Sequence, residues 1–241
     1  MIILLPTAKE LNEEVLPTSE IAPKSLTQEI SQVVASYNLD ELMKLYKINE
    51  NLAQTVHKQW QAILKHEAIS YPAWQLFDGL MYRQIQRANL SAAQMDYVTK
   101  TIYLTSALYG VIPATSGIAP HRLDFQQRLK INQHSLKQNW QAYFDQTVEK
   151  HTPILSLLSS EFEEVFSKSV RQQFYRCIFI EKKAGKERIH STISKKARGK
   201  LVNCCIQHQI TTIDQIRQLQ FDGFSYQFHR SSERELVFIK G

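Results

Sequence analysis

The sequence contains few cysteines and few recognisable motifs, and both absences exclude kinds of protein. Among its 241 residues are three cysteines, Cys177, Cys204 and Cys205, without a C-x-x-C pair. A small, odd number of cysteines argues against a disulfide framework and is typical of a reducing compartment. The eight histidines are scattered and no H-E-x-x-H motif is present, so we expect no metal site. Glycine-rich nucleotide motifs are also missing, and we expect no cofactor.

Long apolar runs are missing too. The opening, MIILLPTAKEL, has only a short apolar run and no basic segment before it, which argues against a signal peptide. A membrane-spanning helix needs a run of about 18 apolar residues or more, and no stretch of this chain approaches it. We therefore expect a soluble, cytoplasmic protein with no membrane partner.

The segments that are present alternate between strand-like and helix-like patterns. Residues 2–6 predict a short buried strand that ends at Pro6, and helical spacing dominates residues 26–64. Ser91 is a candidate N-cap for the segment SAAQMDYVTKTI. The segment QFYRCIFIEKKAGKERIHSTI predicts a hairpin that turns at Ala184–Gly185, and two further strands close the chain. The pattern predicts an α/β fold of mixed α+β type, with helices packed on a mixed sheet and hairpins toward the C-terminus. We expect a single domain over residues 1–241.

Positive charge is concentrated in one segment. The net charge of the chain is +6, and residues 182–200 hold eight Lys and Arg residues against one acid, Glu187. This segment therefore accounts for the whole positive net charge, a pattern typical of proteins that bind a polyanion. The alternative is an ordinary solvated helix face that follows a lysine-rich hairpin.

The end of this basic segment predicts a helix over residues 194–209. At 100° per residue, the helix buries a stripe made of Ala197, Leu201, Cys204 and His208. Gly199 removes a side chain at a point where another backbone or a ligand can approach closely.

The cations of this helix surround the buried stripe. They are Lys196 and Lys200 on one side, Arg198 on the other, and Lys195 further round. Cations at a helix start are unfavourable by about 0.3–1 kcal/mol each. Their presence favours an anion docked against them, and phosphate matches several Lys and Arg donors best.

Three other segments hold candidate functional residues. The hairpin around Tyr109 and Gly110 can present backbone N–H groups to a phosphate, and the alternative is an ordinary turn. Glu161 follows a strand and can act as a general base, with Ser159 as a hydrogen-bonding or nucleophilic group. The alternative is that Ser159 caps the following helix. Lys9 follows the first strand directly, where an isolated lysine is typically solvated.

Several segments also match a known family in order. They are PTAKE, LFDGLMY, SALYGVIPATSGIAPHRLDF, Trp140, LSLLSSEF, ISKKARG and RSSERELVF. With them the chain resembles the bacterial YaaA family of peroxide-stress proteins over nearly its whole length. The combination of KKARG, LYGV and a terminal ELVF is specific, although each segment alone is weak.

The resemblance implies a cytosolic protein that helps bacteria survive hydrogen peroxide by limiting free intracellular iron. It also implies a single-domain fold distinctive to the family, with a basic cleft that binds duplex or branched DNA. Carried over by position, the residues expected to line this cleft are Lys9, Tyr109, Gly110, Arg122, Ser159, Glu161, Lys195, Lys196 and Arg198.

Two functions follow from these observations. The first is a DNA-binding protein of the oxidative-stress response, with the Gly110 hairpin and Arg122 in support. Its phosphates would be neutralised by Lys195, Lys196, Arg198 and Lys200.

The second function is an enzyme that processes a nucleobase, a nucleotide or modified DNA and binds a small phosphate-bearing ligand. It requires Lys9, Glu161 and Arg198 to converge on one pocket. Direct sequestration of iron has little support, because no carboxylate–histidine cluster has ligand spacing.

Overall fold

The chain is built around one large mixed sheet. The computed structural model describes residues 1–19, 24–183 and 185–241, and in this part of the chain nine strands form that sheet. Its strands are β1 (Ile2–Pro6), β3 (Ile102–Ser106), β4 (Gly110–Pro113), β8 (Ile154–Ser156), β9 (Phe174–Lys183), β10 (Lys186–Arg188), β11 (Gln220–Phe221), β12 (Phe224–Tyr226) and β13 (Glu235–Lys240). The order is β11-β12-β13-β9-β8-β1-β3-β4, with β10 paired to β9.

Helices and short strands surround this sheet. The helices are α1 (Ser25–Ala35), α2 (Leu39–Tyr46), α3 (Glu50–Leu64), α4 (Ala73–Leu76), α5 (Ala92–Thr101), α6 (Leu136–Val148), α7 (Ser160–Glu163), α8 (Lys168–Arg171), α9 (Ser191–His208) and α10 (Ile213–Arg217), with 3-10 turns η1 (Tyr82–Gln84) and η2 (Phe228–Arg230). Two small ladders join β2 (Tyr71–Pro72) to β5 (Gly117–Ile118) and β6 (Lys130–Ile131) to β7 (His134–Ser135). The predicted mixed α/β fold is confirmed.

The middle of the sheet is parallel and fully buried. β1 pairs in parallel with β3 on one side and with β8 on the other, and β8, β9 and β13 continue the parallel arrangement. Residues 2–5 of β1 are at most 2% exposed, as expected for a parallel strand covered on both faces. The chain leaves β1 toward β3 and later returns to β8 on the opposite side. Such a switch opens a crevice at the carboxyl ends of the strands.

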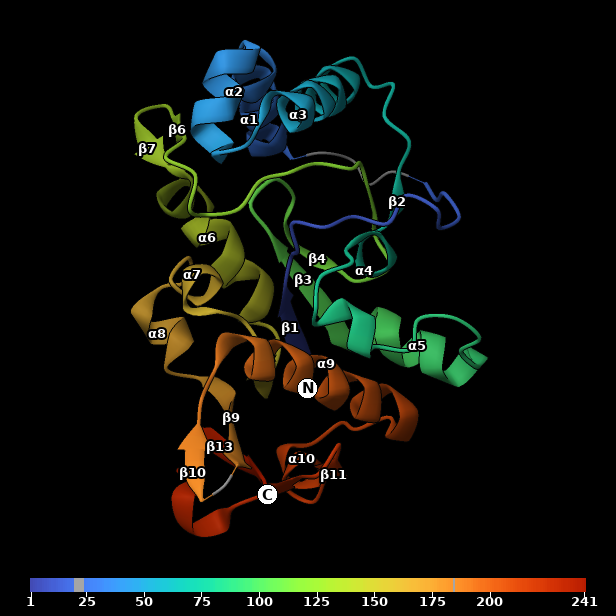
Figure 1. Ribbon diagram of the computed structural model, residues 1–241, viewed down its shortest axis with the longest axis vertical. Coiled ribbons are helices and arrows are strands. Elements are labelled where there is room, and N and C mark those ends of the chain that lie inside the picture. The colour runs from blue at the N-terminus through green and yellow to red at the C-terminus, as the bar shows by residue number, and fades with distance from the viewer. Residues whose placement is uncertain (20–23, 184) are drawn as a thin grey trace.

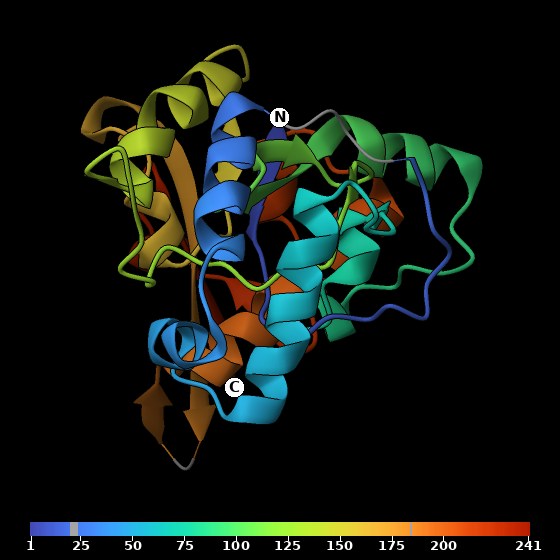
Figure 2. The same ribbon diagram turned by 90° about the horizontal axis from the view of Figure 1, so that it is seen from above.

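The helices form layers against the sheet. Figure 1 shows α1, α2 and α3 together at the top of the molecule and the C-terminal strands at the bottom, with α9 lying between them. α5 packs against β1, β3 and β4, while α9 packs beside α5 and against β9. On α6, the ring of Phe144 packs edge-to-face against Phe166, which in turn contacts Phe174 of β9. Figure 2 shows the β9–β10 hairpin projecting from the body.

Local sequence signals place several elements correctly. Pro6 is the last residue of β1, and Ser91 caps α5 in a reciprocal pair of hydrogen bonds with Gln94. The hairpin of β9 and β10 and the closing strands β12 and β13 form as predicted. Ala184 of the predicted turn lies outside the described residues. In the described part of the chain, no helix has both the length and the apolar character needed to cross a membrane.

The basic helix differs from its prediction in two ways. α9 begins at Ser191 rather than residue 194, so Lys195 lies beyond the first turn, where the unfavourable end charge has faded. The buried stripe also includes Val202, Cys205 and Ile206. Two residues of the predicted stripe are not buried: Cys204 is half-buried and His208 is exposed. The next residues round the helix, among them Cys205 and Ile206, are buried in their place.

Candidate functional site

A cavity of about 350 Å³ lies where β1 and β8 end. Residues 6–10, at the end of β1, form one wall, and Ser159 and Glu161, which follow β8, form another. The remaining walls come from residues 79–82, residues 122–126 and α9. This is the crevice that the strand order predicts, and a volume of this size is typical of a small-molecule site.

Six of the residues predicted from the sequence meet in this cavity. They are Lys9, Arg122, Ser159, Glu161, Lys195 and Arg198. They come from four separate segments of the chain, so only the fold brings them together. The convergence of Lys9, Glu161 and Arg198, which an enzymatic site requires, is therefore present.

Three cations of the cavity have no partner among the residues that the structure describes. Lys9 forms an ion pair with Asp124, with 3.2 Å between its Nζ and Oδ2. No hydrogen bond or ion pair within the described residues involves the side chains of Arg122, Lys195 or Arg198. Burial lowers the pKa of Arg198, and the negative charge of Glu163 opposes this. A guanidinium keeps its proton nonetheless, so the cavity contains a half-buried charge that an anionic ligand would stabilise.

A pair of carboxyl groups faces these cations. Glu161 accepts hydrogen bonds from the backbone N–H of Phe125 at 3.0 Å and from Nε2 of Gln126 at 2.8 Å. Burial raises the pKa of Glu161, and the neighbouring Asp124 carboxylate raises it further. The two hydrogen bonds and the Lys9 ammonium oppose this rise. A carboxyl group with a raised pKa is suited to proton transfer.

Ser159 is positioned at the junction of β8 and α7. It occupies the N-cap position of α7, and its side chain makes no capping hydrogen bond. Its backbone carbonyl instead accepts hydrogen bonds from Phe162 and Glu163. The hydroxyl of Ser159 therefore remains available to the cavity, unlike that of an ordinary capping serine.

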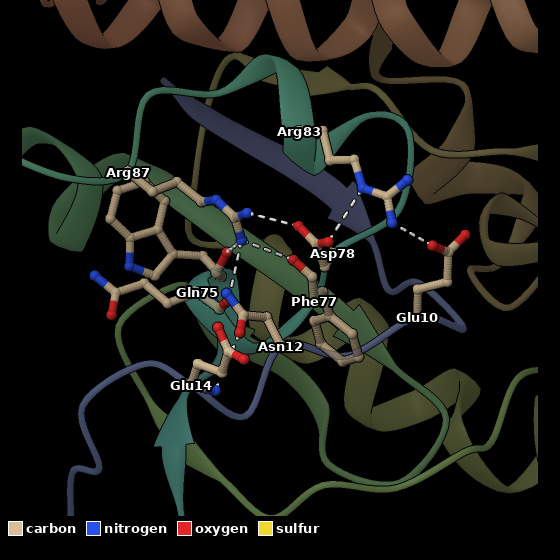
Figure 3. A network of polar contacts seen from close by, with 9 residues as sticks. Glu10, Asn12, Glu14, Gln75, Phe77, Asp78, Arg83 and Arg87 are labelled. Carbon is tan, nitrogen blue, oxygen red and sulfur yellow. Dashed lines mark hydrogen bonds and ion pairs between the residues drawn. The ribbon is translucent and has the colours of Figure 1, made fainter.

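A cluster of two arginines and two acids holds the wall formed by residues 79–82 (Figure 3). Arg83 bonds both Asp78 and Glu10, which ties this wall to the segment after β1. Arg87 bonds the same Asp78, with 2.9 Å between Nη2 and Oδ1. Its Nη1 also donates to the backbone carbonyls of Trp74, Gln75 and Phe77. Through Glu10, the neighbour of Lys9, the cluster holds the segment after β1 against the wall formed by residues 79–82. Arg83 and Arg87 themselves do not line the cavity.

Lys196 and Lys200 lie at a different place. They line a second hollow of about 430 Å³ with Lys240, Glu181 and Asp222. On a helix of 3.6 residues per turn, these two lysines point roughly 150° away from Lys195 and Arg198. The basic run of α9 therefore serves two hollows rather than one.

Tyr109 and Gly110 are structural and line neither hollow. Tyr109 is 2% exposed, and its hydroxyl accepts a hydrogen bond from the backbone N–H of Ala119. Gly110 has a φ of +80°, and a Cβ there would lie 2.7 Å from the ring of Trp140 and 3.0 Å from Nζ of Lys24. The turn between β3 and β4 therefore requires glycine for reasons of packing and backbone conformation.

The sequence analysis missed Asp124 and the residues that hold it. Asp124 is 7% exposed and pairs with Lys9. Its Oδ1 also accepts a hydrogen bond from the backbone N–H of Gln126. In the sequence it is an isolated acid in the segment HRLDF, two residues after Arg122. In the described residues, no group of three or more His, Cys, Asp or Glu side chains is arranged to hold a metal ion.

Comparison with known proteins agrees with the resemblance found in the sequence. The family model of the peroxide stress protein YaaA matches residues 1–230. A UPF0246 protein of Streptococcus gordonii is 47% identical over 243 aligned residues, covering 100% of this chain and 98% of the relative. A UPF0246 protein of Streptococcus pneumoniae is 45% identical, covering 100% of this chain and 99% of the relative. The chain therefore belongs to the peroxide stress protein YaaA family, which is named for the response to peroxide stress.

Proposed function

We propose that the chain acts in the cytoplasm during peroxide stress by binding DNA phosphates at the cavity that follows β1 and β8. The observation that carries this proposal is that Arg122, Lys195 and Arg198 line one cavity without a protein partner in the described residues. Phosphate oxygens are the acceptors that match Arg and Lys donors best. The family name supports the link to peroxide stress.

The size of the cavity indicates which form of DNA it receives. A volume of about 350 Å³ is at the lower end of the range for small-molecule sites. It is suited to one nucleotide unit rather than to a stretch of duplex. A base reaches an enclosed pocket only when it leaves the stack, which costs least where it is unpaired. We therefore expect branched or locally unpaired DNA to bind more tightly than a continuous duplex.

The protection against iron follows from the same site. The resemblance to the family implies that the protein limits damage caused by free iron and hydrogen peroxide. We propose that the protein protects DNA directly, because the DNA segment that it covers is shielded from the radicals that iron generates. Iron binding by the chain itself is not part of the proposal.

The test is salt-titrated binding of branched DNA to the wild-type chain and to the double variant Lys195→Ala, Arg198→Gln. Each neutralised phosphate contributes about −0.9 to the slope of log K against log salt. The double variant should therefore show a slope shallower by between about 0.9 and 1.8. Lys150→Ala is the matched control, because Lys150 precedes the amino end of β8, whereas the cavity lies at the carboxyl end of that strand. An unchanged slope in a folded double variant would refute the proposal.

A second function, catalysis on a nucleobase or nucleotide in the same cavity, is favoured by the carboxyl pair. Glu161 has a raised pKa and lies beside Asp124, the partner of Lys9. In this function Glu161 transfers the proton, Ser159 orients the substrate and the cations hold its phosphate. Incubation of wild type and Glu161→Gln with nucleotides and with branched DNA tests it, with products separated by chromatography. Product formation by wild type alone supports catalysis, and absence of product from both leaves binding as the function.

A further inference from the structure

The second hollow of the molecule lies beside the first and is also cationic. Its volume is about 430 Å³. Three lysines and two acids line it, which are Lys196, Lys200, Lys240, Glu181 and Asp222. Thr192 and Gln84 add polar groups to its wall.

Two of the three lysines in this hollow are available to bind an anionic ligand. Lys240 pairs with Asp222, with 3.2 Å between its Nζ and Oδ2. Lys196 and Lys200 take part in no hydrogen bond or ion pair within the described residues. Glu181 is the remaining acid, so the hollow as a whole carries one net positive charge. A phosphodiester carries one negative charge and matches this balance.

The two hollows adjoin along the N-terminal half of α9. Lys195 lines the first and Lys196, the next residue, lines the second. A Cβ built at Gly199 would lie 2.1 Å from the Met81 carbonyl oxygen and 2.8 Å from the Cβ of Gln84. Met81 lines the first hollow and Gln84 lines the second. The close packing of Gly199 against these two residues therefore forms a ridge that separates the two hollows. Figure 1 shows α9 in the corresponding place, between the end of β1 and the C-terminal strands.

We propose that a single DNA strand crosses this ridge, with one nucleotide in the first hollow and neighbouring phosphodiester groups in the second. The inference rests on the proposed function of the first cavity and names the substrate class: a single-stranded segment longer than one nucleotide. An α-helix with its side chains is about 10–12 Å across, so a mononucleotide cannot occupy hollows on two sides of it. Among the described residues of the lining, Phe224 alone has an aromatic ring, and it is 3% exposed. The second hollow therefore contacts phosphates rather than stacked bases, and binding there is independent of sequence.

The test compares thymidine monophosphate with a single-stranded thymidine tetranucleotide. The ligands are titrated at several salt concentrations against wild type, Lys196→Ala with Lys200→Ala, Lys195→Ala with Arg198→Gln, and the control Lys150→Ala. Lys196 is exposed and Lys200 is half-buried, and neither belongs to the core, so their double variant should fold, and thermal melting verifies this. We expect that variant to bind the mononucleotide as wild type does. For the tetranucleotide its salt slope should be shallower by between about 0.7 and 1.4, for one or two phosphates in the second hollow, since each single-strand phosphate contributes about −0.7.

The outcomes separate this inference from the function on which it rests. If the Lys196, Lys200 variant binds the tetranucleotide with an unchanged slope, the strand does not reach the second hollow and the inference is wrong. The same conclusion follows if that variant loses mononucleotide binding, because the hollows are then not separate sites. If the Lys195, Arg198 variant binds both ligands as wild type does, the proposed function itself is wrong.

Discussion

Replacing Gly199 with alanine tests the contact that separates the two hollows. The added Cβ would lie 2.1 Å from the carbonyl oxygen of Met81, 3.0 Å from its carbonyl carbon and 2.8 Å from the Cβ of Gln84. Ordinary contacts of a Cβ begin at about 3.4 Å. Two of the atoms in conflict belong to the backbone, so no side-chain rotation relieves them. Either α9 or the segment of residues 79–84 must move.

The magnitude follows from two opposing effects. Alanine in a helix interior is favoured over glycine by about 1 kcal/mol. Overpacking of a filled site costs about 1–3 kcal/mol and sometimes more, and a clash with backbone belongs at the upper end. We therefore expect Gly199→Ala to lower the free energy of unfolding by about 2 kcal/mol. For a chain of this length each kcal/mol shifts Tm by about 2–4 °C, so Tm should fall by ~4–8 °C.

Differential scanning calorimetry measures this change. Gln207→Ala is the matched control, because Gln207 is an exposed residue of the same helix and its replacement should leave Tm nearly unchanged. A Gly199→Ala variant with a Tm equal to or above that of wild type would show that helix propensity outweighs the contact. The close contact between α9 at Gly199 and the backbone of Met81 would then be refuted.

Three further changes have expected outcomes. Burial raises the pKa of Glu161 in the folded chain, so the stability that this group contributes is present at low pH and is lost as pH rises through the folded-state pKa. Glu161→Gln should therefore raise Tm more at neutral pH than at acidic pH. Thermal melts at both pH values test this, and a larger rise at acidic pH would contradict it. Gly110→Ala meets both a φ of +80° and the ring of Trp140, so urea unfolding should show a loss of about 2 kcal/mol or more. Arg87→Met removes the donor from the carbonyls of three residues and from Oδ1 of Asp78, while Oδ2 of Asp78 keeps Arg83. A loss of about 3 kcal/mol is expected in guanidinium unfolding. A loss below about 1 kcal/mol would show that water replaces the arginine.

The parts of the fold that local chemistry determines could be predicted from the sequence. β1 is apolar throughout residues 2–5 and ends at Pro6, and α5 begins after Ser91, whose hydroxyl accepts from the N–H of Gln94. Each of these signals acts within four residues, so no knowledge of the rest of the chain is needed. The buried stripe of α9 was harder, because several apolar residues compete for one face and the neighbouring strand decides which are covered.

The candidate site could be predicted only in part. Lys9, Glu161 and Arg198 were recognised in separate segments, but their convergence depends on β1 pairing with β8 and on the position of α9. Asp124 was missed because an isolated acid has no local signature. It matters here because the loop that carries it brings its carboxylate within 3.2 Å of Lys9.

The number of cations in a stretch of sequence can exceed the number that belong to any one binding site. Lys195 and Lys196 are neighbours in the chain, yet the helical turn between them directs one to each hollow. A count of cations in residues 182–200 therefore combines at least two places on the surface, and a variant that removes adjacent lysines weakens both. Pairs chosen by helical face, Lys195 with Arg198 and Lys196 with Lys200, remove one place at a time. Only such pairs can show whether the protein binds a single nucleotide or a longer strand.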